Sequence, residues 1–212
     1  MALRLDTRER VVYLVVPERA NMSVAKQFAK EYKHWIEEKI SALPEPVSFL
    51  DDTTIPLFGR NVEIRVNYDP TLKRTSIELK PRILLVNTNK QDPKEISDRI
   101  TRFLKKEAGR VIRALAIEKA ARLGKGINSV SVRDTRSRWG SCAEDGDLSF
   151  SWRLIFAPWE ALDYVVAHEV AHLVHMNHGK AFWNLCARIS TDYETGRDWM
   201  RDHGNELMRF GQ

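Results

Sequence analysis

The chain has 212 residues, which suffices for one domain with a substantial hydrophobic core or for two small domains. Hydrophobic residues make up 43% of it and charged residues 30%, a balance that excludes an intrinsically disordered chain and a membrane-embedded one. The net charge of +5 is modest, so it is compatible with an acidic partner but does not by itself indicate one.

We expect a cytoplasmic protein that makes no contact with a membrane. The longest apolar run near the N-terminus covers only residues 11–16, which is too short for the core of a signal peptide or for a membrane-spanning helix. The two cysteines, Cys142 and Cys186, are too few for a disulfide framework, as is typical of a reducing compartment.

The first ninety residues alternate between strand-like and helix-like patterns. Residues 11–16 are rich in β-branched and aromatic side chains and predict a strand. Apolar residues at three- and four-residue steps then predict an amphipathic helix from Ser23, its expected N-cap, to about Leu43. Further strands are expected at residues 54–57, 62–66, 76–80 and 83–86. For residues 1–90 we therefore predict a small antiparallel sheet with one helix against it.

Residues 91–212 are expected to contain more helix. Asp92, Pro93 and Glu95 occupy the cap and first-turn positions of a helix that runs to about Leu123. Later elements are expected as strands at residues 130–133 and 148–152, a loop between them that includes residues 137–142, and helices from Pro158 onward. No Gly/Ser-rich linker marks a clean boundary, and we place the division between two domains near residue 90.

The most informative segment is residues 168–172, His-Glu-Val-Ala-His, followed six residues later by His178. On a helix, His168 and His172 lie on one face, so both imidazoles can reach the same ion. Zinc is commonly held by nitrogen ligands, and a catalytic site has three protein ligands with one position left open. The surrounding segment is apolar, so these polar side chains need a partner such as a divalent ion. We predict one zinc ion per chain.

The third ligand is a choice between His175 and His178. His168 and His175 would be separated by about 10.5 Å of helical rise, which is too far for one ion to bridge on a straight helix. His178 directly precedes Gly179, where the chain can turn back toward the ion. We therefore expect His178 as the ligand, and His175 as a surface residue or as a group behind the ligands.

Two other ligand frames are considered. Glu194 lies at a suitable distance along the chain to be a carboxylate ligand on a following helix, but a third histidine makes it superfluous. The spacing H-E-x-x-H-x5-H also matches the metzincin frame, although that frame has a glycine where this chain has His175. Met200 as the corresponding Met-turn is disfavoured, because it lies in a charged, helix-like stretch.

This ligand set predicts hydrolysis by activated water. Three neutral histidines leave the charge of the ion in place, which lowers the pKa of a bound water to about 7. Glu169 stands where H-E-x-x-H hydrolases have their general base, so it would accept the proton of this water and later pass it to the leaving group. The activated water would attack the scissile bond with no covalent intermediate.

A family resemblance rests on longer motifs around this segment. The motifs are residues 136–142 (RSRWGSC), 148–155 (LSFSWRLI), 157–158 (AP), 162–173 (LDYVVAHEVAHL) and 178–183 (HGKAFW). They resemble those of the YgjP-like metal-dependent hydrolases, relatives of the SprT and WLM zinc peptidases. The resemblance implies a minimal zincin-like metallopeptidase fold, zinc held by His168, His172 and His178, and catalysis by Glu169. With the N-terminal strands, the expected class is α+β, with a β-rich N-terminal extension.

The substrate is less constrained. A metallopeptidase is favoured, and the alternatives are a phosphohydrolase acting on a nucleotide or other phosphorylated small molecule, and a nucleic-acid-associated protease. Arg136, Arg138 and Arg153 should lie near the cleft, where arginine suits carboxylate or phosphate groups of a substrate. The helix at residues 99–125 carries a basic stripe. The simplest interpretation is a solvated helix face, and the alternative is a surface that binds nucleic acid.

Overall fold

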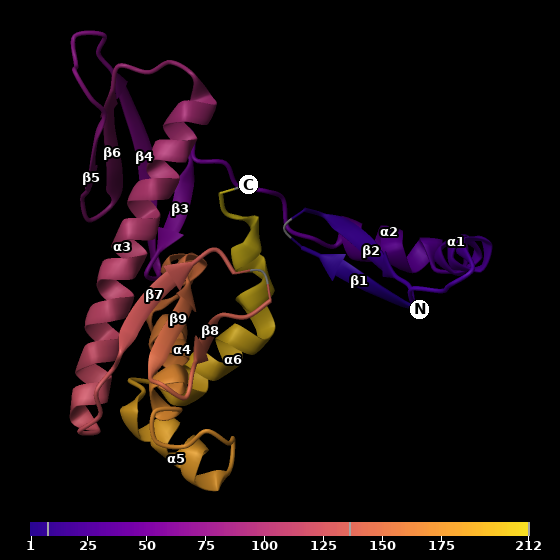
Figure 1. The fold of residues 1–212 in the computed structure, drawn as a ribbon. Helices are drawn as coiled ribbons and strands as arrows, with labels where there is room; N and C mark the ends of the chain where they lie inside the picture. The colour runs from indigo at the N-terminus through magenta and orange to yellow at the C-terminus, as the bar shows by residue number, and fades with distance from the viewer. Residues whose placement is uncertain (8, 136, 212) are drawn as a thin grey trace.

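The computed structural model describes residues 1–7, 9–135 and 137–211. Its first four elements form a small unit at one side of the molecule (Figure 1): β1 (Ala2–Asp6), β2 (Val11–Val15), α1 (Met22–Glu31) and α2 (Lys33–Ser41). β1 and β2 pair as an antiparallel hairpin. Among the described residues before residue 47, Asp6 and Ala25 alone are buried, so this unit has almost no core of its own.

The predicted helix from Ser23 to Leu43 is two helices in the structure. Tyr32 ends α1 and precedes α2, and its backbone leaves the helical region. The N-cap predicted at Ser23 is wrong, because Asn21 takes this position and its side chain accepts a 2.8 Å hydrogen bond from the Ser23 amide. Asparagine and serine are equally strong caps, so composition does not distinguish them.

A four-stranded sheet follows, made of β3 (Thr54–Leu57), β4 (Arg60–Tyr68), β5 (Ser76–Leu79) and β6 (Ile83–Thr88) in the order β3-β4-β6-β5. All four strands lie where the sequence predicted them. The sheet is mixed and not antiparallel throughout, because β4 and β6 are parallel neighbours. After β4 the chain forms β5 at the outer edge of the sheet. It then reverses into β6, which lies between β5 and β4 and runs parallel to β4.

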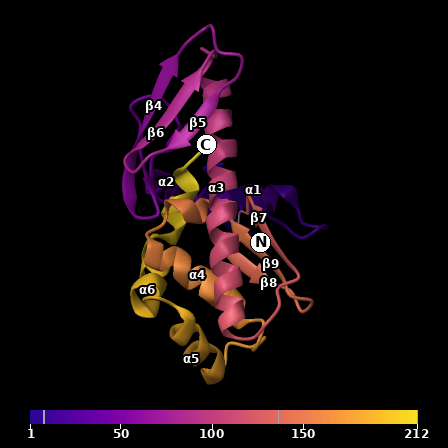
Figure 2. The same ribbon diagram turned by 90° about the vertical axis from the view of Figure 1, so that its left-hand side faces the viewer.

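The long helix α3 (Pro93–Arg122) joins the two ends of the fold (Figure 2). Its predicted start is confirmed, since the Asp92 side chain accepts a hydrogen bond from the Lys94 amide. The 30 residues span roughly 45 Å. Its buried positions recur at three- and four-residue steps: Ile96, Ile100, Leu104, Ala108, Ile112, Leu115, Ala116, Lys119 and Ala120. The helix therefore runs past the four-stranded sheet and packs further along against the C-terminal half.

The C-terminal half contains a three-stranded sheet and three helices. The elements are β7 (Ser129–Arg133), β8 (Gly140–Cys142), β9 (Asp147–Ser151), the short 3-10 helix η1 (Trp152–Phe156), α4 (Trp159–Ala171), α5 (Lys180–Ile189), α6 (Tyr193–His203) and a second 3-10 helix, η2 (Gly204–Arg209). The strand order is β7-β9-β8, which leaves β8 at an edge of the sheet. The sequence predicted β7 and β9 but not β8.

Helix α4 lies at the centre of this half, in contact with α3, α5, α6 and β8. Helix α6 approaches it closely at Gly196, where a β-carbon would lie 2.6 Å from Cβ of Tyr164. A buried ion pair also joins α4 to α3, with Lys119 Nζ 2.7 Å from Asp163 Oδ1. Lys119 also donates to the carbonyl of Ile189, and Asp163 accepts from the Thr191 amide. Because a buried charge without its partner is costly, this pair holds α3, α4 and the turn after α5 in one arrangement.

Within the described residues the fold is mixed, with six α-helices and three small sheets, as expected for the α+β class. One buried hydrophobic cluster extends from Phe49 to Phe210 and includes residues of the four-stranded sheet, α3 and α4. The division of the chain near residue 90 stays a prediction. None of the helices described here is long and apolar enough to cross a membrane.

Candidate metal centre

His168 and His172 lie at the C-terminal end of α4, one helical turn apart. Their ring centroids are separated by 5.0 Å. The helix ends at Ala171 with His172 as its C-cap, before His175 is reached. Because the helix stops here, the following residues are free to turn back toward the two histidines.

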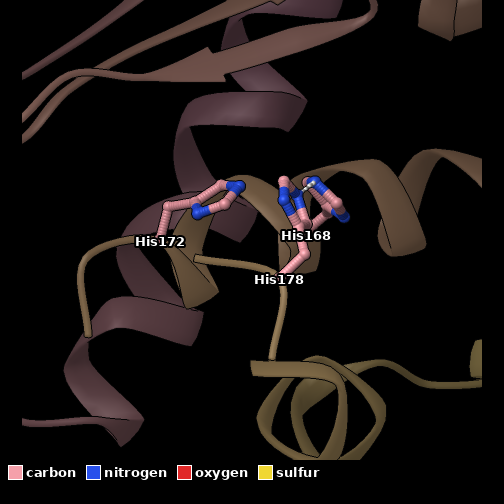
Figure 3. A group of neighbouring side chains, drawn as sticks. All are labelled: His168, His172 and His178. Carbon is pink, nitrogen blue, oxygen red and sulfur yellow. Dashed lines mark hydrogen bonds between the residues drawn. The ribbon is translucent and has the colours of Figure 1, made fainter. Parts of the chain in front are cut away.

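His178 completes the cluster from the loop between α4 and α5 (Figure 3). Its Nε2 atom lies 3.1 Å from Nε2 of His168, and one ring nitrogen from each of the three histidines lies within 4.8 Å of the others. The structure thus brings together the three histidines that the sequence predicted as ligands. Their role as ligands stays a prediction, which the following geometry supports.

His175 does not join this cluster of ring nitrogens. Its backbone carbonyl instead lies 3.0 Å from Nδ1 of His172. A carbonyl can only accept, so Nδ1 of His172 carries the proton and Nε2 retains its lone pair. This is the arrangement that metal-binding histidines commonly have, with the second ring nitrogen bonded to an acceptor. His175 therefore contributes its backbone, and not its imidazole, to the site.

The cluster fits a divalent cation with nitrogen ligands. Tetrahedral zinc with Zn–N distances of 2.0–2.1 Å has its ligand nitrogens about 3.3 Å apart, close to the 3.1 Å between His168 and His178. Burial and the neighbouring histidines lower the pKa of His168 to about 4, and burial lowers the pKa of His172. Both imidazoles are therefore neutral near pH 7, which is the form that binds a metal.

Two aromatic residues of α5 surround the histidines. Phe182 is fully buried, and its ring centroid lies 4.9, 4.5 and 4.7 Å from those of His168, His172 and His178. Trp183 lies 5.6 Å from His168 and 5.4 Å from His178. These contacts limit the rotation of all three imidazoles and exclude water from their inner side.

Glu169 points toward the edge strand β8. Its side chain is buried, with 7% of the residue exposed, and a β-carbon at Gly140 would lie 2.5 Å from its Cγ and Oε1 atoms. Burial raises the pKa of Glu169 to about 7, an effect that the positive charge of Arg138 partly opposes. A carboxyl group with this pKa can both accept and release a proton near neutral pH. The carboxyl group occupies the space that the missing side chain of Gly140 leaves.

The role of Gly140 was missed at the level of sequence, although the residue lies within the quoted Trp-Gly-Ser-Cys motif. The available signal is a glycine within a strand, which often marks a place where another group approaches the backbone closely. That signal requires β8 to be recognised as a strand, and β8 has only three residues.

The three arginines proposed to bind substrate differ in position. Arg138 is exposed, and its charge acts on Glu169, so it stays a candidate for substrate binding. Arg153 is fully buried in η1, where its guanidinium pairs with Asp134 and lies 4.9 Å from the ring centroid of Trp152. Its position in the core removes it from the proposed substrate-binding set. Arg136 lies outside the described residues.

Other nearby groups do not extend the cluster. Cys142 is not among the clustered groups, and burial raises the pKa of its thiol to about 11. Glu194 is exposed on α6, away from the clustered ring nitrogens. Met200 is buried within α6 and is therefore not part of a turn.

Comparisons with known proteins place this site in a family. A search of curated proteins and a search of solved structures found no match. The family model described as YgjP-like, metallopeptidase domain, matches residues 1–203. Such a match covers almost the whole chain and agrees with the motifs around the histidines. The chain therefore belongs to the YgjP-like metallopeptidase-domain family, and this membership suggests a metal-dependent hydrolase.

Proposed function

We propose that the protein is a zinc-dependent peptidase with a minimal zincin-like architecture. The observation that carries the proposal is the cluster of ring nitrogens of His168, His172 and His178 at the end of α4, the helix that also carries the buried carboxyl group of Glu169. Three imidazoles suit zinc, and a buried carboxyl group on the residue that follows the first of them suits a general base.

The bound ion and the protein side chains would have separate roles in hydrolysis. When bound, a divalent ion supplies Lewis-acid chemistry that acidifies a water molecule and polarises the bond under attack. Glu169 takes a proton from the attacking water and delivers it to the leaving amine, for which a pKa about 7 is well matched. Gly140 leaves room for this carboxyl group, and Phe182 and Trp183 hold the histidines in place.

The edge strand β8 supports a peptide as the substrate. Among the described strands it pairs with β9 alone, so we expect its other edge to pair with an extended chain. Strand β8 also carries Gly140, beside Glu169, so a peptide paired with this edge would pass the catalytic carboxyl group. Arg138 lies two residues before β8, where its guanidinium suits a substrate carbonyl or carboxylate.

A phosphohydrolase is less well supported. It would require several arginines that converge on phosphate groups, and Arg153 is buried against Asp134 and Trp152. Of the described arginines that were proposed to contact substrate, Arg138 alone remains available.

A parallel assay distinguishes the two activities. Purified protein is incubated with an unfolded protein such as casein, and separately with a panel of nucleoside triphosphates. We expect new peptide termini by mass spectrometry, no release of phosphate, and loss of cleavage after treatment with a zinc chelator. Phosphate release without peptide cleavage would overturn the proposed peptidase activity.

A further inference from the structure

A groove with an apolar floor and a basic rim lies at one end of the four-stranded sheet, away from the histidines. Two adjoining cavities of about 490 and 590 Å³ share Arg60 and Pro81 in their walls. They are bordered by the β3–β4 and β5–β6 turns, the middle of α3 and the first residue of α4, Trp159. Trp159 precedes His168 by roughly 13 Å of helical rise, so this groove is separate from the metal centre.

The floor of the groove is apolar. It includes the buried side chains of Leu57 and Val62, the partly buried Val111 and Phe58, and Trp159, which is 37% exposed. Such a floor can receive leucine- or phenylalanine-sized side chains, which gain free energy when they leave water.

The rim of the groove is positively charged. Four exposed cations line it: Arg60, Lys80, Arg82 and Arg110. Lys80 pairs with Glu78 and Arg110 with Glu107, whereas Arg60 and Arg82 form no ion pair within the described part of the chain. No acidic residue is among the described residues that line either cavity. The rim is therefore complementary to carboxylates or phosphates.

The turns that form the groove are held in place by the rest of the fold. Phe58 has a φ of +51°, a strained conformation for a residue with a side chain, and its amide donates a 2.8 Å hydrogen bond to the carbonyl of Ile155. At Gly59, a β-carbon would lie 3.5 Å from Cα of Pro158, which shows how closely this turn packs on the start of α4. The groove is thus preorganised, which lowers the entropic cost of binding.

We propose that this groove binds an acidic peptide segment with interspersed apolar side chains, presented by another protein. The carboxylates of the segment meet Arg60 and Arg82, and its apolar side chains lie on the floor beside Trp159. Single-stranded nucleic acid also suits a basic groove, but such grooves usually offer several aromatic rings on which successive bases stack. Here the floor is largely aliphatic, and among the described lining residues it offers the exposed ring of Trp159 and the partly buried ring of Phe58.

The inference goes beyond the proposed peptidase activity and does not depend on it, because it is tested by binding and not by turnover. The probe is a short fluorescein-labelled peptide in which aspartates alternate with leucines and phenylalanines. Comparison probes carry lysines in place of the aspartates, or serines in place of the apolar residues, and a labelled oligothymidine represents nucleic acid. Fluorescence anisotropy measures the affinity of the full chain for each.

We expect the acidic-apolar peptide to bind most tightly. Arg60→Glu combined with Arg82→Glu should weaken it at least about tenfold, because two attractive charges become repulsive. Trp159→Ala should also weaken the binding of this peptide, because it removes an apolar contact from the floor of the groove. The matched control is Lys73→Glu with Arg74→Glu, which makes the same charge change on exposed residues of the loop at the opposite end of the sheet and should leave the affinity unchanged.

Three results would overturn the proposal: no binding of the acidic-apolar peptide, equal weakening by the groove and control variants, or tighter binding of oligothymidine. Thermal unfolding of each variant verifies that it is folded. If the double variant does not fold, Trp159→Ala and the two comparison peptides still decide the outcome.

Discussion

Replacing Glu169 with glutamine should reduce turnover by about 10²–10⁴-fold while the chain keeps its metal. Glutamine has nearly the shape of glutamate and fits the same space beside Gly140, but its amide cannot accept the proton of the attacking water. The ring nitrogens of His168, His172 and His178 do not depend on this carboxyl group for their positions. The measurement is kcat on the protein substrate, together with zinc per chain by mass spectrometry.

Glu194→Gln is the matched control, because Glu194 is an exposed glutamate of α6 that lies outside the clustered groups. We expect it to retain wild-type turnover. Full activity in Glu169→Gln would show that another group accepts the proton, and the proposed mechanism would then be wrong.

A methyl group added at Gly140 should displace the same carboxyl group. A β-carbon at this position would lie 2.5 Å from Cγ and Oε1 of Glu169 and 2.8 Å from its Cδ, so the side chain must move. The atoms that it meets belong to one side chain and not to backbone, so we expect the side chain to shift while the backbone keeps its course. A displacement of the base by about 1 Å can cost on the order of 100-fold in rate. We therefore expect Gly140→Ala to lose kcat with little change in the melting temperature or the zinc content.

Gly126→Ala provides the control for this variant. A β-carbon at Gly126 would have no atom within 4 Å, and its backbone is outside the left-handed region. It should therefore leave turnover unchanged. If Gly140→Ala were as active as Gly126→Ala, the carboxyl group of Glu169 would not need the position that the structure gives it.

The parts of the molecule that the sequence predicted are those governed by local rules. Asp92 and Pro93 predict the start of α3, because capping depends on a few adjacent residues. His168 and His172 share one face of α4 because their spacing matches the helical repeat. The choice of His178 over His175 follows from helical rise. In the structure α4 already ends at Ala171, so the chain has six residues in which to bring His178 back to the other two histidines.

The features that were missed depend on tertiary contacts. The order of β4, β5 and β6 is determined by which strands pair across the sheet. The sequence pattern of each strand by itself does not reveal this pairing. Strand β8 is too short for an alternating pattern to be visible. Arg153 was expected near the substrate because the segment that carries it should lie near the cleft, and the ion pair with Asp134 that makes its burial tolerable joins residues far apart in the chain.

The most direct test of the metal centre is the zinc content of His178→Ala compared with that of His175→Ala, each measured beside the wild-type chain after purification without chelators. His178 places a ring nitrogen in the cluster, whereas His175 contributes only its backbone carbonyl, which alanine retains. We predict about one zinc per chain for the wild type and for His175→Ala, and a marked loss for His178→Ala. A wild-type chain without zinc, or a His178→Ala variant that keeps its zinc while His175→Ala loses it, would contradict the proposed site.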